Sequence, residues 1–458
     1  MQAGLKILKK VSFFRNTSHF LYKSSKNSNF ASDLFKAIEE YKAAEMEKQT
    51  IKKQYKSRYN GKNKKRPWQN YSEEISEEVK RRKANFNPED RIKRKKTVIL
   101  LGYCGANYYG MQRNPGQQTI EEDLFKAMLK CKWIDEEGFN QPQQIHFQRA
   151  ARTDKGVSAA RQICSVKLPE KLDLEAINSE LPDVIRVFAT RRVTKGFNSK
   201  DQCNARTYTY TMPTIALDAE ANASEYASYR ISKTNRERFE EILSMYEGTK
   251  NFHNFTSKKE FLDPSSKRYI MSFKTDEPFL SENGLEFITC RVKGQSFMLH
   301  QIRKMVGLAL AIVRGNANKD VMDRVFEENR LDIPMAPGLG LVLDQVHYDR
   351  YNERYGNDGV HENLTWTEFE PEIEKFIKTY INPTIFEIEF KDKPMLNWIE
   401  TLGYHTYDVR AIDDEKIKNI SQKEILKTEH LDIHSKNHDF VPPEKELDGK
   451  IDEKFSLK

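Results

Sequence analysis

The chain has 458 residues, of which 31% are charged and 38% hydrophobic, and its formal net charge is +8. This length exceeds the usual size of one hydrophobic core, so we expect two packed domains and less ordered additions. No apolar run reaches the roughly eighteen residues that a membrane helix needs, so we expect a soluble protein. The five cysteines show no C-x-x-C spacing, which argues against a disulfide framework or zinc site and predicts no structural metal.

Residues 1–96 are predicted to be a basic, largely disordered N-terminal extension. Within it, residues 1–35 combine Lys and Arg with apolar residues and have no acid before Asp33, as is typical of a mitochondrial presequence. An unstructured basic tail is the alternative. The later runs NGKNKKRPW and RRKANFNPEDRIKRKK fit nuclear import signals, RNA-phosphate contacts or solvated linkers. The expected location is therefore the mitochondrion, the nucleus or both.

Ordered structure is predicted to begin at Thr97, and Thr119 and Glu122 have the spacing of a helix capping box. Helices and strands alternate irregularly, which predicts an α+β fold in two halves, 97–215 and 216–350, with helices on one sheet face. Residues 351–458 are predicted to form a polar C-terminal extension whose last 30 or so residues are disordered. Strands are predicted over 97–103, 162–168, 184–193, 205–213, 266–275, 285–294 and 338–349, and helices over 33–56, 119–130, 173–181, 234–248, 297–314 and 318–329.

Residues 149–162, RAARTDKGVSAARQ, place Asp154 among basic residues and just before Gly156. A glycine can adopt a tight-turn conformation, which would leave the carboxylate at the tip of a loop. Arg152 and Lys155 should favour the ionised form, which suits a nucleophile or general base. The alternative is an ordinary turn acid that has no chemical role.

The predicted strand 205–213 places Arg206, Tyr208 and Tyr210 on one face, opposite Thr207 and Thr209. An aromatic ring can stack on an unpaired base and an arginine can hold a phosphate, so this face fits a nucleotide site. Ordinary packing of the tyrosines within a sheet is the alternative.

The predicted helix 297–314 carries Arg303 on its apolar side. A buried guanidinium needs an acidic partner or strong acceptors, and Asp154 is a candidate. A structural ion pair or an arginine that extends to solvent near the helix end is the alternative. The apolar arc that includes Arg303 consists of Leu299, Val306, Leu310 and Val313.

The ten histidines show no metal-binding spacing, and His253, His300 and His347 are isolated, so we interpret them as packing residues or RNA contacts. The glycine-rich segment GYCGANYYG lacks the spacing of a phosphate-binding loop. No nucleotide cofactor and no metal are expected.

Four separated motifs carry a family resemblance. ARTDKGVSA resembles the signature of the TruA class of pseudouridine synthases, and ARTYTY, FMLHQIRKMVG and GLGLVL are similar to its tyrosine-bearing strand, arginine-bearing helix and closing strand. GTKNFHNFT and YGNDGVH are similar to the eukaryotic branch of the class. The resemblance covers about residues 97–390.

The resemblance implies two ferredoxin/RRM-like α+β halves with the active site in a basic cleft between them. It implies that Asp154 is catalytic, Arg152 helps to hold an extruded uridine, Tyr208 packs on the uracil and Arg303 pairs with Asp154. The implied reaction is isomerisation of uridine to pseudouridine in tRNA, notably in the anticodon stem, or in other RNAs such as snRNA or mRNA, without a cofactor. A catalytically inactive RNA-binding relative and a hydrolase that releases the base are the competing hypotheses.

Overall fold

The computed structural model describes residues 93–410 apart from 222, 258 and 357, and they belong to one compact unit that begins at Ile92. The expected presequence, the basic runs before residue 93, the helix predicted over 33–56 and the tail expected to be disordered lie outside the described residues.

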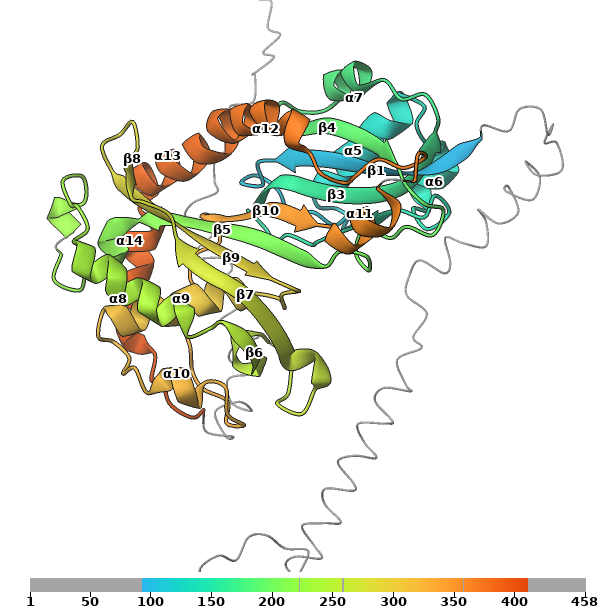
Figure 1. Cartoon of the computed structure of the whole chain (residues 1–458). Helices are drawn as coiled ribbons and strands as arrows, with labels where there is room; N and C mark the ends of the chain where they lie inside the picture. The colour runs from blue at the N-terminus through green and yellow to red at the C-terminus, as the bar shows by residue number, and fades with distance from the viewer. Residues whose placement is uncertain (1–92, 222, 258, 357, 411–458) are drawn as a thin grey trace, which may run out of the picture. The chain divides into compact units, whose positions relative to one another are not determined.

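A ten-stranded mixed sheet organises this unit (Figure 1), in the order β4-β1-β3-β10-β5-β9-β7-β6, with β2 beside β3 and β8 beside β9. Neighbouring strands are antiparallel, except that β10 and β3 are parallel. The strands are β1 (Arg94–Tyr103), β2 (Gln148–Arg149), β3 (Ser158–Pro169), β4 (Ile185–Arg192), β5 (Ala205–Pro213), β6 (Gly248–Asn251), β7 (Lys267–Thr275), β8 (Phe279–Leu280), β9 (Glu286–Gly294) and β10 (Leu341–His347).

Strand β10 lies between β3 and β5, although it comes last of the strands in the sequence. Val342 and Leu343 pair with β3 on one side, and the same strand pairs with β5 on the other. Strand β5 in turn pairs with β9 from Arg206 to Pro213. The backbone hydrogen bonds therefore continue across the ranges 97–215 and 216–350, and the description of these ranges as separate halves stays a prediction.

The predicted strands are all present, with ends shifted by a few residues. In β1, the residues from Lys96 to Tyr103 are buried in succession. Strands flank β1 on both sides and helices cover the sheet, so an unbroken apolar run is favoured over alternation at this position.

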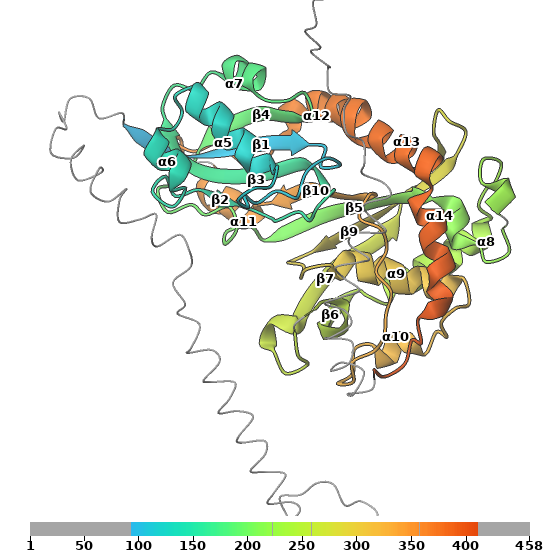
Figure 2. The same cartoon turned by 180° about the vertical axis from the view of Figure 1, so that it is seen from behind.

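Helices cover both faces of the sheet. Figures 1 and 2 show α5 and α7 on one face of β1 and β4, and α12 on the opposite face. The prediction that helices lie on one face only is therefore wrong, because it did not include α12. The helices are α5 (Ile120–Lys130), α6 (Glu136–Asn140), α7 (Leu174–Glu180), α8 (Lys233–Ser244), α9 (Gln301–Val313), α10 (Val321–Arg324), α11 (Asp349–Tyr355), α12 (Glu370–Phe376), α13 (Asn382–Asp392) and α14 (Pro394–Ile399).

The predicted capping box at the start of α5 forms in part. The hydroxyl of Thr119 accepts a hydrogen bond from the backbone N–H of Glu122, as a helix N-cap does. The carboxylate of Glu122 does not return a bond to Thr119 in the structure, because it accepts one from Arg113 Nε at 2.7 Å. This helix start is thus joined to the preceding turn.

Helix α9 starts later than predicted. His300 precedes it with a left-handed backbone, φ 62°, which breaks the helical periodicity. Leu299 therefore lies outside the helix and is 53% exposed, so its predicted place on the buried arc is wrong. Val306, Leu310 and Val313 are buried as expected.

The segment predicted as a polar extension from residue 351 contains helices with buried faces as far as residue 410. Ile373, Phe376, Ile385 and Leu402 are buried, and Phe376 meets Phe188 of β4 edge to face at 5.7 Å. The Lys and Glu residues that make the segment polar lie mainly on its outer faces. This part of the extension therefore contributes to the core.

Candidate active site

The loop that carries Asp154 is held by the turn after β1. The backbone N–H of Gly156 donates to the carbonyl of Tyr108 at 3.1 Å, and Met111 N–H donates to the carbonyl of Thr153 at 3.2 Å. Within the loop, Val157 N–H donates to the carbonyl of Asp154 at 3.1 Å, and Gly156 adopts φ 77°. This positive φ is the conformation that the sequence predicted for a glycine after the acid.

Buried side chains fix the entry to this loop. Gln162 of β3 accepts from the backbone N–H of Ala151 at 3.3 Å and donates to its carbonyl at 2.9 Å. The hydroxyls of Tyr103 and Thr153 are hydrogen-bonded at 2.9 Å, and burial raises the pKa of Tyr103, which keeps its proton available for that bond. Asp154 is thus attached to a rigid support, as a catalytic group requires.

The Asp154 side chain is 30% exposed, and its Oδ2 lies 3.9 Å from Nε2 of His300. Its negative charge also acts on Tyr208 and Arg303. The structure therefore brings together three residues that the sequence singled out from separate motifs, and it adds a fourth, His300.

Tyr208 projects from β5 toward this group. It is 8% exposed and packs edge to face against Phe297, with ring centroids 5.3 Å apart. Burial raises the pKa of Tyr208 to about 12, and the charge of Asp154 adds to the rise. On the same face, Arg206 donates to the carbonyl of Ala150 at 2.7 Å and so supports the segment that leads into the Asp154 loop.

Tyr210 has a different role from Tyr208. It is 1% exposed, and its hydroxyl donates to the carbonyl of Pro337 at 2.7 Å. For Tyr210 the structure favours packing, which was one of the two interpretations of this strand.

Arg303 lies near Asp154 but does not form the expected direct ion pair; among the described residues, no acidic oxygen lies within 4.0 Å of its guanidinium. Its Nε donates to the carbonyl of Ala336 at 2.7 Å, and a Cβ atom at Gly338 would lie 3.6 Å from the guanidinium carbon. Burial lowers the pKa of Arg303, whereas Tyr210 and Asp154 oppose that change. The carbonyl of Ala336 thus supplies the hydrogen-bond acceptor that the buried guanidinium of Arg303 needs.

The basic residues of the loop divide into two groups. Arg152 is exposed, and no partner for it is found among the described residues. Lys155 is exposed with its ammonium 4.4 Å from the ring centre of Tyr109, which is itself 53% exposed. Arg149, in contrast, pairs with Glu121, a buried carboxylate. Arg152 and Lys155 are therefore free to meet a polyanion, whereas Arg149 serves the fold.

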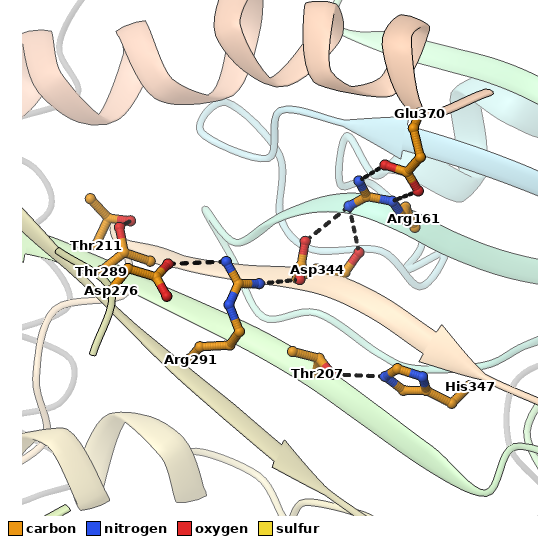
Figure 3. A network of polar contacts seen from close by, with 9 residues as sticks. All are labelled: Arg161, Thr207, Thr211, Asp276, Thr289, Arg291, Asp344, His347 and Glu370. Carbon is orange, nitrogen blue, oxygen red and sulfur yellow. Dashed lines mark hydrogen bonds and ion pairs between the residues drawn. The ribbon is translucent and has the colours of Figure 1, made fainter. Parts of the chain in front are cut away.

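Arg161 also serves the fold, within a polar network on the opposite face of the sheet (Figure 3). Asp344 of β10 accepts from Arg161 at 2.9 Å and from Arg291 of β9 at 2.6 Å. Arg161 also pairs with Glu370 of α12, and Arg291 pairs with Asp276 at 3.1 Å. Arg149 and Arg161 are therefore engaged in ion pairs within the protein.

His300 is the site residue that the sequence did not identify. The histidines show no metal-binding spacing in the sequence, and His300 is isolated from the others. The signal that could have revealed it is its position three residues before Arg303, at the entry to the same helix.

Across the described part of the chain, no cluster of three or more His, Cys, Asp or Glu side chains could hold a metal ion. None of the helices between residues 93 and 410 is long and apolar enough to cross a membrane.

An acid on a rigid loop, a buried tyrosine ring and a buried arginine define a site for covalent or acid–base chemistry on a planar ligand. Comparison with known proteins identifies the family of the chain. The tRNA pseudouridine synthase family matches residues 242–349. The chain is 46% identical to the mouse protein named pseudouridylate synthase 1 homolog over 329 residues, which is 71% of this chain and 78% of the relative.

Two further relatives carry names of the same enzyme class. The human pseudouridylate synthase 1 homolog is 47% identical over 319 residues, 69% of this chain and 74% of the relative. The Yarrowia lipolytica protein named tRNA pseudouridine synthase 1 is 33% identical over 388 residues, 66% of this chain and 72% of the relative. The chain belongs to the TruA-type tRNA pseudouridine synthase family, an isomerase family, as its motifs indicated.

Proposed function

We propose that this protein converts specific uridines of tRNA to pseudouridine, with Asp154 as the nucleophile. The observation that carries the proposal is the convergence of Asp154, Tyr208 and Arg303 from three separate elements at one site. The family relationship gives no support to the competing hypothesis of an inactive RNA-binding protein.

The chemistry follows from these groups. The target uridine is extruded from the RNA, because its glycosidic bond is out of reach inside a stack. Asp154 attacks the uracil or its ribose, the glycosidic bond breaks, and the freed uracil rotates and rejoins through carbon. Tyr208 packs on the uracil ring, Arg152 holds the extruded nucleotide, and Arg303 stabilises the carboxylate of Asp154 through space.

The finer architecture is also part of the proposal. We infer two RRM-like halves, 97–215 and 216–350, joined through β10 and β5, with the substrate cleft between them. Support comes from the position of the site, where the loop after β2 and the start of α9 approach β5. Arg152 and Lys155 would supply positive charge at the rim of that cleft.

The test is the pair Asp154→Asn and Asp154→Ala, assayed for pseudouridine in a tRNA transcript. Loss of the nucleophile should abolish turnover, whereas tRNA binding should persist because the rim cations remain. Full pseudouridine formation by either variant would rule out this role of Asp154. Mass spectrometry separates the hydrolase hypothesis, because a hydrolase releases free uracil and an isomerase leaves the RNA mass unchanged.

The proposal extends to the choice of substrate and to the location. Uridines of the anticodon stem are the proposed targets, and other RNAs such as snRNA or mRNA are secondary candidates. The proposed locations are the mitochondrion and the nucleus, from the basic composition of residues 1–35 and of the two later runs. A fluorescent reporter fused to residues 1–35 should enter mitochondria; a diffuse cytosolic signal would contradict the presequence.

A further inference from the structure

His300 faces the proposed nucleophile directly. Its Nε2 lies 3.9 Å from Oδ2 of Asp154, and this is the ion-pair contact of Asp154 within the described part of the chain. The imidazole is 31% exposed, so a substrate bound against Asp154 can reach it.

The backbone of His300 is in an unfavourable conformation for a residue with a side chain. Its φ is 62° and ψ 2°, a left-handed region that residues with a Cβ atom seldom adopt. Histidine occupies the N-cap position of α9, yet its side chain makes no capping hydrogen bond. Neither the turn conformation nor helix capping therefore requires a histidine at this position. Left-handed conformations of residues other than glycine concentrate at functional sites.

Burial favours the neutral form of the His300 imidazole. Burial lowers the pKa of His300, and Arg303 and Lys304 of α9 lower it further, whereas Asp154 alone among these groups raises it. Neutral imidazole can accept a proton. Once His300 has accepted a proton, the resulting imidazolium is stabilised by the negative charge of Asp154, provided that Asp154 is a free carboxylate.

The reaction requires such an acceptor. Conversion of uridine to pseudouridine replaces the C5–H bond of uracil with a bond from C5 to the ribose C1′, whichever atom Asp154 attacks first. The C5 proton must therefore leave to a base, and N1 must gain a proton. A side chain in position to take a proton accelerates such a step by about 100- to 10,000-fold.

We propose that His300 accepts the proton that leaves C5 of the rotated uracil. The inference rests on the proposed function. After C5 bonds to C1′, Asp154 is released as a carboxylate. The C5–H bond then breaks, its electron pair re-forms the C5=C6 double bond while the electron pair of the C6=N1 double bond returns to N1, and the proton moves to Nε2 of His300. N1 takes a proton from water and the imidazolium returns one to water, so the net change is an isomerisation.

The experiment uses the full chain and a tRNA transcript that carries deuterium at C5 of uridine. His300→Asn removes the imidazole but tolerates a left-handed backbone, and His300→Gly removes it while relieving that backbone. His361→Asn is the matched control, because His361 also faces a carboxylate, with Nδ1 2.6 Å from Oδ2 of Asp358, away from the site.

We expect single-turnover rates to fall about 100-fold in both His300 variants, with unchanged tRNA affinity and a larger C5 deuterium isotope effect than in the wild type. Added imidazole should restore part of the rate of His300→Gly, and His361→Asn should behave as the wild type. Wild-type rates in both His300 variants would overturn the inference, as would a loss that shows no isotope effect and no imidazole rescue.

The outcome is separable from failure of the proposed function. An active Asp154→Asn variant would contradict the proposed function itself. If Asp154→Asn is inactive but His300→Asn and His300→Gly turn over at wild-type rates, only the proton transfer by His300 is contradicted.

Discussion

Gly110 shows how a single residue sets the position of the proposed nucleophile. Its φ is 90°, and a Cβ atom at this position would lie 2.7 Å from the carbonyl oxygen of Thr153 and 3.3 Å from the carbonyl carbon of Asp154. Real Cβ contacts are rarely this short, so the backbone of the loop that carries Asp154 can approach Gly110 because the side chain is absent.

Gly110→Ala should therefore displace the loop. We expect a loss of about 1–3 kcal/mol of unfolding free energy from the positive φ and the clash, and a fall in turnover of at least tenfold as Asp154 moves. Denaturant unfolding and single-turnover assays measure the two effects.

Gly116→Ala is the matched control for this substitution. Gly116 has φ 77°, but nothing lies within 4 Å of its Cβ position. It should lose stability through backbone strain alone and retain turnover. Equal loss of turnover in both variants would show that strain, and not contact with the loop, is responsible.

At the scale of the elements, α13 contains a buried acid that the reaction does not use. Glu389 is 2% exposed, and its Oε2 accepts from Met395 N–H at 3.2 Å and from the Tyr226 hydroxyl at 3.5 Å. Burial raises the pKa of Glu389 to about 8, which these hydrogen bonds only partly offset. The packing of α13 on the rest of the molecule is thus linked to pH.

The sign of that link follows from proton binding. An unfolded glutamate has a pKa of about 4.3, so between about pH 4.5 and 8 the folded state binds more protons than the unfolded state. The contribution of Glu389 to stability is therefore present at low pH and is lost as the pH rises toward 8. Glu389→Gln, which is neutral throughout, should gain thermal stability relative to the wild type as the pH rises from 5 to 8.

Melting temperatures at several pH values test this prediction. Glu387→Gln is the control on the same helix, since Glu387 is exposed and pairs with Lys391 at 3.4 Å. It should follow the wild-type curve. Parallel curves for Glu389→Gln and the wild type would show that Glu389 does not titrate in this range.

At the scale of the whole molecule, Asp344 connects strands that lie far apart in the sequence. It joins Arg161 of β3 to Arg291 of β9 across β10 and β5, and Arg161 continues to Glu370 of α12 (Figure 3). The side chains of Arg161 and Asp344 are 12% and 18% exposed, so this pair is shielded from solvent. Removing one partner would leave a largely buried charge unpaired.

Asp344→Asn should lower the free energy of unfolding by about 2 kcal/mol, less than for a fully buried pair because Arg291 remains half-exposed. Turnover of the folded protein should change little, since the network lies on the sheet face opposite Asp154. Urea unfolding measures the loss.

Glu372→Gln is the control for the network, because Glu372 and its partner Arg186 are 44% and 47% exposed at 3.2 Å. Glu372→Gln should change the free energy of unfolding by no more than about 0.5 kcal/mol. An Asp344→Asn variant as stable as Glu372→Gln would show that the network does not stabilise the sheet.

The sequence by itself determined the local features of this protein. Seven of the ten strands in the described part of the chain were predicted, as were the Thr119 cap, the turn at Gly156 and the shared face of Tyr208 and Arg206, because these features depend on residues close in the chain. Motif spacing also sufficed for the family and pointed to Asp154 as the proposed nucleophile, because each motif is a short contiguous segment.

Only the tertiary structure decided which groups meet. It paired Arg149 with Glu121 and Arg161 with Asp344, gave Arg303 a backbone acceptor at Ala336, and set His300 beside Asp154. It also buried one side of the helices after residue 351, although their composition is polar. The physical reason is that an ion pair or a buried surface depends on partners far along the chain, and local composition does not specify those partners.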